Sequence, residues 1–389
     1  MPQIKPEIET FARIKVVGAG GSGGNAIARM MQCAIRGVDF IAINTDAQDL
    51  HHTNAPVKIH IGKNLTKGLG AGMVPDVGRQ AAEETKGEIQ DALRGADMVF
   101  VVAGLGGGTA SGAAPVIAEV AKDAGALTVA VVTRPFSFEG AQRARIAEEA
   151  WHALREKVDA LITISNDKLL HIIDRKTTLT NAFWVCDEVL RQGVQGISDL
   201  ITMPGIVNVD FADVRTIMQN TGSALMGVGR ALGEDRAVQA AQAAINSPLL
   251  DISIDGARGV LFNVTGGADL TMAEINDAAK VITESIDRDA KVIFGAVEDP
   301  KMKKGEIKVT VVATGFSPVS AERPEAVSDI FRREEPKAVS VGIKSAEKKP
   351  MPVAAMASAQ AQGGEFSPEV TSVSDEEWDI PAFIRRKMK

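Results

Sequence analysis

Short apolar runs alternate with amphipathic segments from Ile14 to about residue 166. The apolar runs lack the polar alternation of a half-solvated strand, which is typical of strands buried on both faces. The segments between them repeat apolar residues every three or four positions and predict helices. Together they predict a parallel sheet covered by helices on both faces. The predicted strands include 40–46, 98–104, 127–136 and 161–167, and the predicted helices are 25–35, 77–95, 113–125 and roughly 140–157.

The pattern changes in the second half of the chain. Residues 177–203 carry apolar positions at helical spacing throughout and predict one long helix. Beyond it, strands and helices no longer alternate regularly, which predicts a second, α+β domain. We expect its last two strands to pair as neighbours. The predicted elements are helices at 212–220 and 235–246 and strands at 257–267, 291–299 and 306–316.

The segment from Ser317 to about Ser374 loses all apolar periodicity and is rich in Pro, Ala, Ser, Glu and Lys. It cannot bury enough apolar surface to offset the entropy of ordering, so we expect a flexible linker. The whole is an α/β chain with these parts: a flexible N-terminal arm (1–11), a Rossmann-like parallel-sheet domain (12–176), a long central helix (177–204), a smaller α+β domain (205–316), a disordered linker (317–374) and a C-terminal peptide (375–389).

The amino-acid composition argues against several classes of function. The net charge of −7 argues against a broad surface for nucleic acid or an anionic membrane. Aromatic residues make up 4% with no Tyr, so base stacking is an unsuitable binding mode. Cys33 and Cys186 lie far apart and fit two reduced core thiols in a cytosolic protein. The N-terminus resembles neither a signal peptide nor a membrane span, so we expect a cytoplasmic protein. The five histidines show no ligand spacing, and we expect no structural metal.

Two glycine-rich loops follow predicted strands: GAGGSGGN (18–25) and GLGGGTASG (104–112). Glycines let backbone N–H groups turn toward an anion, and the helix that follows adds free N–H groups. The hydroxyls of Ser22, Thr109 and Ser111 add further donors. Either loop alone fits tight packing of a strand on a helix. Two such loops in one sheet favour a site that holds one polyphosphate from two sides.

The two glycine loops can be compared with known phosphate-binding motifs. The chain has no Gly-Lys-Ser or Gly-Lys-Thr of a Walker loop and no kinase signature. A Rossmann dinucleotide site fits better, because GAGGSG follows a strand and Asp46 lies about 20 residues beyond it. That alternative, a nicotinamide-dependent oxidoreductase, leaves the second glycine loop unexplained.

Several motifs resemble the FtsZ family of bacterial cell-division GTPases. GGGTASGAAPVIAEVAK is similar to the tubulin-type signature GGGTGTG, and six further segments match in order: GAGGSGGNAI, NTDAQ, TKGLGAG, TRPFSFEG, NVDFADVRTIM and DIPAFIRR. The resemblance covers about residues 12–316 and the last dozen. It implies a GTPase that binds GTP or GDP with Mg²⁺, polymerises head to tail and forms the division ring on the inner face of the membrane. A plasmid-partition or cell-shape filament protein is the other tubulin-like alternative, which NVDFADV and the tail disfavour.

The resemblance also implies a nucleotide site. Its guanine contact falls on Asp187, whose carboxylate can accept two hydrogen bonds that adenine does not offer. Phe183, four residues earlier, shares a helix face with it and can stack on the base. The implied nucleotide contacts are Gly21, Ser22, Gly23, Gly24, Asn25, Gly106, Gly107, Gly108, Thr109, Ala110, Ser111, Gly112, Glu139, Arg143, Asn166, Phe183 and Asp187.

The implied catalytic residues lie elsewhere, in NVDFADV. Asn208, Asp210 and Asp213 would reach the γ-phosphate held by the adjacent subunit, polarise the attacking water and help place a cation. Without the resemblance, Asp210 fits an ordinary helix cap equally well. The chain departs from the family at Ala110, where glycine is usual. Alanine there costs roughly 1 kcal/mol or more if φ is positive, and favours the helix if φ is negative.

The tail DEEWDIPAFIRRKMK predicts a short amphipathic segment that folds onto a partner, since so few residues cannot hold a helix alone. A merely solubilising tail is the alternative, which Trp378 and Phe383 disfavour. The resemblance implies binding to membrane tethers such as FtsA and ZipA and regulators such as MinC, without direct membrane contact. The implied partner-binding residues are Asp379, Ile380, Pro381, Phe383, Ile384, Arg385 and Arg386.

Overall fold

A computed structural model describes residues 12–35, 37–170, 177–203, 205–207, 209–247, 253–299 and 302–316. The chain divides into two compact units, residues 1–323 and 324–389, and every described residue belongs to the first. The predicted arm, linker and C-terminal peptide, with all seven partner-binding residues, lie outside the described residues, and so does Asn208.

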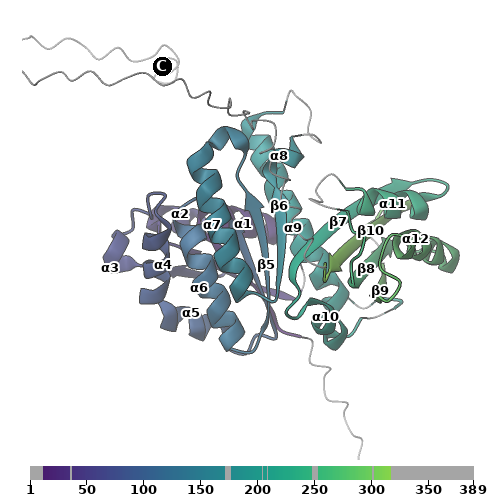
Figure 1. The fold of residues 1–389 in the computed structure, drawn as a ribbon, viewed down its shortest axis with the longest axis horizontal. Coiled ribbons are helices and arrows are strands. Elements are labelled where there is room, and N and C mark those ends of the chain that lie inside the picture. The colour runs from purple at the N-terminus through teal and green to yellow at the C-terminus, as the bar shows by residue number, and fades with distance from the viewer. Residues whose placement is uncertain are drawn as a thin grey trace, which may run out of the picture. The chain divides into compact units, whose positions relative to one another are not determined.

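A ten-stranded sheet runs through the first unit in the order β3-β2-β1-β4-β5-β6-β7-β10-β8-β9 (Figure 1). Strands β1 to β7 pair in parallel along this order. The uninterrupted apolar runs predicted β1, β2, β4, β5 and β6, whereas β3 and β7 were not predicted. The strands are β1 Ile14–Ala19, β2 Val38–Asn44, β3 Val57–His60, β4 Met98–Gly104, β5 Leu127–Arg134, β6 Ala160–Ser165, β7 Gly222–Leu232, β8 Gly259–Gly266, β9 Lys291–Glu298 and β10 Glu306–Thr314.

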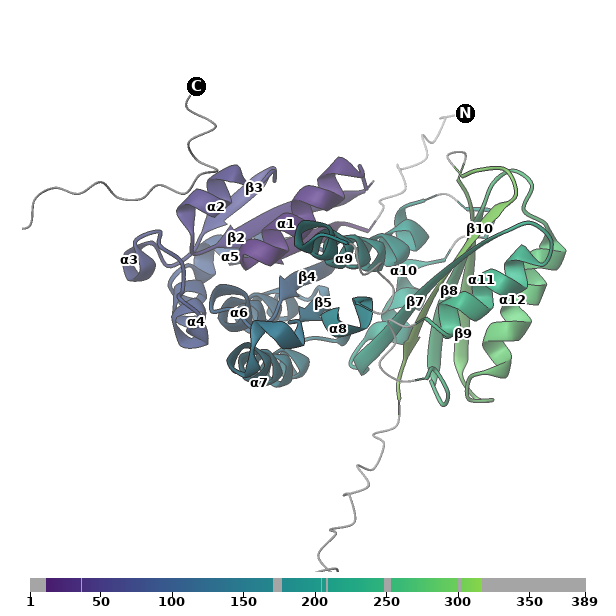
Figure 2. The ribbon, with the colours of Figure 1, turned by 90° about the horizontal axis from the view of Figure 1, so that it is seen from above.

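Helices cover both faces of the parallel part (Figure 2). One core packs α1, α9 and α10 on the sheet, and the other packs α4, α5, α6 and α7. The predicted α/β architecture is confirmed. The helical elements are α1 Gly20–Gln32, α2 Ala47–His52, α3 Lys63–Thr66, α4 Pro75–Glu84, α5 Lys86–Leu93, α6 Thr109–Asp123, the 3₁₀ helix η1 Ser137–Glu139, α7 Ala141–Lys157, α8 Asn166–Leu169, α9 Leu179–Thr202, α10 Phe211–Met218, α11 Arg236–Ile245 and α12 Met272–Glu284.

The long central helix is α9, which lies within the predicted span. Its start is fixed by Thr178, whose Oγ1 accepts a hydrogen bond from the Asn181 N–H at 3.3 Å. Its buried side joins the core under the parallel sheet. None of the helices that the structure describes is long and apolar enough to cross a membrane.

Two sequence predictions of the fold were wrong. Residues 77–95 form two helices rather than one, because the chain leaves helical geometry at Thr85 with φ −108° and ψ 16°. Strands β9 and β10 are not neighbours: β8 lies between them, antiparallel to β10 and parallel to β9. Local apolar spacing marks a strand but carries no information about which distant strand it joins.

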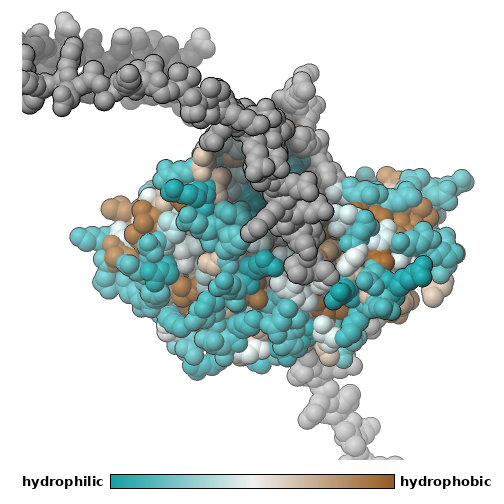
Figure 3. All heavy atoms as spheres, in the orientation of Figure 1, coloured by the Kyte–Doolittle hydropathy of each residue, from teal (hydrophilic) through white to brown (hydrophobic). Residues whose placement is uncertain are grey.

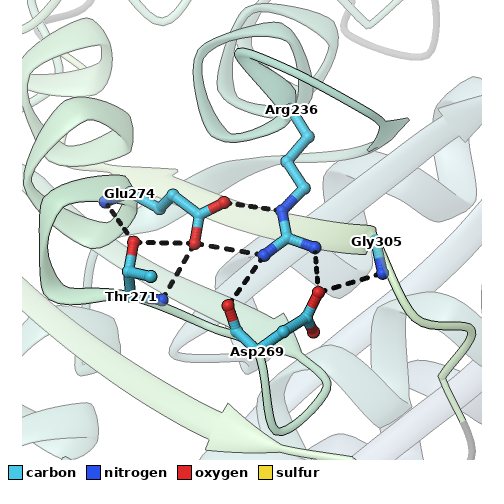
Figure 4. A network of polar contacts seen from close by, with 5 residues as sticks. All are labelled: Arg236, Asp269, Thr271, Glu274 and Gly305. Atoms are coloured by element: carbon cyan, nitrogen blue, oxygen red, sulfur yellow. Dashed lines mark hydrogen bonds and ion pairs between the residues drawn. The ribbon is translucent and has the colours of Figure 1, made fainter.

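In the smaller α+β part, the buried side chain of Arg236 links several loops (Figure 4). Arg236, at the start of α11, donates to the Glu274 carboxylate at 2.6 Å and to the Asp269 carboxylate at 2.8 Å. Asp269 also accepts the Gly305 N–H at 3.0 Å, while Thr271 and Glu274 form a capping box at the start of α12. Hydrogen bonding to Glu274 and Asp269 raises the pKa of Arg236, which stays charged. The network joins α11, α12 and the turn before β10.

Candidate functional site

The candidate site lies where β1 and β4 end and α1 and α6 begin, at the carboxyl edge of the parallel sheet. The glycine segments contribute more helix than the sequence predicted. Residues 20–24 form the first turns of α1 rather than a loop, after a left-handed step at Gly20 with φ +69°. Likewise, α6 begins at Thr109 rather than at Ala113. Both helices therefore present their free N–H groups closer to the sheet edge.

A cavity of about 280 Å³ opens at this edge. The predicted residues that line it are Gly21, Ser22, Gly107, Gly108, Thr109, Ala110, Glu139, Arg143, Asn166, Phe183 and Asp187. Residues that were not predicted also line it: Gly20, Gly104, Leu105, Thr133, Pro135, Cys186 and Leu190. The structure thus brings both glycine segments and residues of α7, α8 and α9 around one hollow.

Other predicted residues stand outside this lining: Gly23, Gly24, Asn25, Gly106, Ser111 and Gly112. Two of these glycines serve close packing. A Cβ on Gly23 would lie 2.6 Å from the Val102 carbonyl oxygen, and a Cβ on Gly112 would lie 1.9 Å from the Pro75 carbonyl oxygen. Gly107 differs, because a Cβ there would meet no atom within 4 Å. Gly23 and Gly112 thus let neighbouring backbones approach closely, whereas Gly107 faces open space.

Hydroxyl groups hold the two glycine segments in place. The Ser22 Oγ accepts the Gly104 N–H at 2.9 Å and so ties α1 to the second segment. The Ser111 Oγ accepts the Gly106 N–H at 3.0 Å. Thr109 and Thr45 share a hydrogen bond of 2.6 Å between their hydroxyls. Thr45 follows β2 and lies in the NTDAQ motif, but it was not predicted as a residue of the site.

Ala110 has no positive φ and is a buried residue in the first turn of α6. Of the two outcomes expected for this position, the helical one holds, and alanine here favours the helix by about 1 kcal/mol over glycine. Its Cβ lies 3.2 Å from the position that a Cβ on Gly20 would occupy. Ala110 therefore packs against the start of α1 without backbone strain.

The cavity is also lined by groups suited to a sugar and a base. Arg143 Nη1 lies 2.5 Å from the Glu139 Oε2, an ion pair along α7 and its preceding turn. Phe183 is 41% exposed and packs edge-on against Phe136, with ring centroids 5.6 Å apart. The Asn166 Oδ1 is buried and has no hydrogen-bond partner among the described residues. A buried acceptor of this kind requires a donor from whatever fills the cavity.

Asp187 lies beside these groups on α9. Burial raises its pKa to about 6, and the nearby positive charge of Arg29 opposes that rise. Arg29 comes from α1, where its guanidinium stacks 3.8 Å over the Trp184 ring and pairs with Glu188 at 3.5 Å. The neighbouring Cys186 is buried, and desolvation raises the pKa of its thiol to about 12. Asp187 is thus ionised at neutral pH, while the thiol stays protonated. Cys33 is exposed, so the prediction of a core thiol was wrong for that residue.

Asp210 and Asp213 are exposed on α10 and do not line the cavity. The Asp210 Oδ1 accepts the Ala212 N–H at 3.2 Å, so this residue does cap α10. Asp213 lies in the first turn of the same helix. The carboxylates that line the cavity itself are those of Glu139 and Asp187.

Comparisons with known proteins agree with this geometry. The model of the Tubulin/FtsZ family GTPase domain matches residues 13–174, and that of the FtsZ family C-terminal domain matches residues 222–317. An FtsZ of M. jannaschii, solved as an empty dimer, is 47% identical, with a TM-score of 0.76 over 79% of this chain and 89% of that chain. CetZ1 of Haloferax volcanii, a GDP-bound monomer, shares the fold at 23% identity, with a TM-score of 0.69 over 79% of this chain and 96% of that one.

The sheet, the glycine-lined cavity and the matched GTPase domain define a tubulin-like GTPase. The chain belongs to the FtsZ family within that class. It is therefore a polymerising cytoskeletal protein of cell division that binds GTP and GDP. The nicotinamide-dependent alternative is excluded, and the second glycine segment that it left unexplained is part of the GTPase domain.

Proposed function

We propose that the cavity binds GTP and that the adjacent subunit of a head-to-tail filament completes its hydrolysis. The phosphates lie against Gly21, Gly107 and the N-terminal turns of α1 and α6. The base reaches Asp187 and Phe183. One observation carries the proposal: the phosphate side of the cavity is lined by glycines, hydroxyls and alanine, whereas Asp210 and Asp213 are exposed on α10 outside it. Exposed carboxylates outside the cavity fit a site that the α10 of a neighbouring subunit completes.

The implied roles follow from charge and reach. Asp210 and Asp213, with Asn208 from the same NVDFADV motif, orient the attacking water toward the γ-phosphate of the next subunit. Thr109 and the helix N-termini stabilise the negative charge that develops on the phosphates. Mg²⁺, carried mainly by the phosphate oxygens, neutralises part of that charge. Since one subunit supplies the phosphate cradle and another the carboxylates, turnover requires assembly.

The surface beside the cavity supports contact with another subunit. Leu65, Leu69 and Val74 are exposed large hydrophobics, and Leu69 is 85% exposed. A Cβ on Gly108 would lie 2.8 Å from the Val74 nitrogen, so this segment adjoins the second glycine loop. Figure 3 shows a hydrophobic patch where α3 lies. Such a patch beside a binding site is typical of an interface.

The proposal predicts that specific GTPase activity depends on protein concentration. Below the assembly threshold, subunits bind GTP but hydrolyse it very slowly, because α10 of a neighbour is missing. Above the threshold, phosphate release per subunit rises to a plateau and coincides with light scattering from polymer. Activity per subunit that is constant across the threshold would mean a self-contained site.

Asp187 gives a pH dependence of GTP binding. Its carboxylate accepts hydrogen bonds from the guanine N1–H and N2–H only when ionised, so affinity is highest well above a pKa of about 6 and falls as pH drops through it. Nucleotide binding to monomers, measured by calorimetry from pH 7.5 to 5 without Mg²⁺, checks this. Asp187→Asn is the control: protonation of the phosphates affects both proteins alike, so only the wild type should show the additional loss.

We also propose that the protein acts at the division site and reaches the membrane through adaptors. The C-terminal peptide, with Asp379, Ile380, Pro381, Phe383, Ile384, Arg385 and Arg386, would dock on tethers or regulators of the FtsA, ZipA or MinC kind. Its apolar and basic residues, which follow a segment without apolar periodicity, support this role. Deletion of residues 375–389 should abolish tether binding while GTP-dependent assembly persists.

A further inference from the structure

We propose that Asp159 is a positioning residue for GTP hydrolysis, because it anchors the helix that carries Asp210 and Asp213 to the GTPase domain. The inference rests on the proposed function, in which α10 acts on the nucleotide of the next subunit. Asp159 does not line the cavity. It acts by fixing the position and orientation of α10.

The Asp159 carboxylate lies just before β6 and is only 5% exposed. Its Oδ2 accepts the Thr128 N–H at 2.9 Å, which fixes the side chain against β5. Its Oδ1 accepts the Asn220 N–H at 3.4 Å, two residues after the end of α10, and lies 3.4 Å from the Lys122 Nζ. The buried charge is thus paired and hydrogen-bonded toward three different segments.

The main chain of Asp159 holds the same segment. Its carbonyl oxygen accepts the Thr221 N–H at 2.9 Å and the Gly222 N–H at 3.0 Å. Between these contacts and α10, Asn220 adopts a left-handed conformation with φ +54°. The chain therefore turns sharply after α10, and both the side chain and the main chain of Asp159 attach it to the GTPase domain.

A second contact ties α10 to α6. Arg215 of α10 donates from Nη2 to the Gly125 carbonyl oxygen at 2.8 Å, just past the end of α6. Lys122, in the last turn of α6, donates to the Asn220 Oδ1 at 3.2 Å. The 15 residues of α6 span roughly 22 Å, and the other end of this helix begins at Thr109 in the cavity. One rigid helix thus bears the phosphate site at one end and the anchor of α10 at the other.

A displacement of α10 by even about 1 Å would misplace the reacting groups, which can lower a rate about a hundredfold. Asp159→Asn keeps the size of the side chain but places an amide NH₂ against a backbone N–H donor. We expect it to lower kcat tenfold or more with GTP affinity and the assembly threshold close to those of the wild type. A purely structural role would instead lower GTP affinity, assembly and turnover together.

Mixed filaments locate the defect. Asp159→Asn is mixed one to one with Asp213→Ala, whose α10 is defective, or with Asp187→Ala, whose cavity is defective. Random head-to-tail mixing would leave roughly a quarter of the interfaces with an intact cavity facing an intact α10 in the second mixture. We expect GTPase activity to recover with Asp187→Ala and not with Asp213→Ala. Recovery with Asp213→Ala alone would place the defect in the cavity and overturn the inference.

Two controls separate the possible failures. Lys157→Ala removes the exposed 2.7 Å pair with Glu119 on α6 without touching α10, and should behave as the wild type. The mixture of Asp213→Ala with Asp187→Ala tests the shared site alone: if it stays inactive, the proposed function fails and not merely the role of Asp159. Should Asp159→Asn not fold, Arg215→Ala carries the same test through the Gly125 contact, and unchanged turnover in that variant overturns the inference.

Discussion

Replacement of Asp213 with alanine should lower GTP turnover about a hundredfold or more while GTP binding stays unchanged. General acid–base and water-orienting groups contribute rates of this order. Asp213 is exposed in the first turn of α10 and contributes only about 0.3–1 kcal/mol to that helix through its dipole. The variant should therefore fold and assemble. Steady-state phosphate release at saturating GTP, with equilibrium GTP binding measured in parallel, checks both parts.

The variant Asp210→Asn separates the catalytic role of Asp210 from its role as the N-cap of α10. Asparagine caps a helix about as well as aspartate, so the bond to the Ala212 N–H is kept and thermal stability should not change. Turnover should nevertheless fall, because the negative charge is lost. Full activity in Asp210→Asn would show that this residue only caps α10, and the catalytic role would then rest on Asp213 and Asn208.

Replacement by alanine should lower thermal stability at Gly112 and GTP affinity at Gly107. A Cβ on Gly112 would lie 1.9 Å from the Pro75 carbonyl oxygen and 2.5 Å from the Arg79 nitrogen, both in the backbone of α4. That helix must move, and such overpacking costs about 1–3 kcal/mol or more. We expect Gly112→Ala to unfold at a clearly lower temperature than the wild type, measured by calorimetry.

Gly107→Ala is the matched variant, since its Cβ meets no atom within 4 Å and φ is not positive. Stability should stay near that of the wild type. GTP affinity should fall about tenfold to a hundredfold, because a methyl group at the phosphate displaces one charge-assisted hydrogen bond of about 1.5–3 kcal/mol. Unchanged affinity would mean that the phosphates do not pass Gly107.

The sequence predicted the parallel sheet and most helices because their residues are buried in regular patterns. The apolar runs of β4 and β5 are buried on both faces, and α9 keeps helical spacing along its length. The break at Thr85 was missed because the apolar spacing continues across it. β8 was predicted as a strand, but its position between β9 and β10 was missed because pairing depends on distant packing.

The candidate site was predicted through motifs rather than through geometry. Gly107, Asn166 and Asp187 were placed by resemblance, and the structure brings them around one cavity. Thr45 lies in the NTDAQ motif, but the motif did not show that its hydroxyl meets that of Thr109. Leu190 was missed because a leucine at such a position is typical of any helix. The packing role of Gly112 was also hidden, since sequence alone does not show that α4 lies against α6. Residues that pack against or orient the binding groups therefore could not be predicted from the sequence.

The most direct test of a site shared between subunits is to mix two inactive proteins. Asp213→Ala keeps its cavity and loses its carboxylate on α10, whereas Asp187→Ala keeps α10 and loses guanine binding. Each alone should show almost no GTPase activity. Mixed one to one, they should regain roughly a quarter of wild-type activity, because an intact cavity then meets an intact α10 at about that fraction of interfaces. No recovery, in a mixture that still forms filaments, would contradict hydrolysis between subunits.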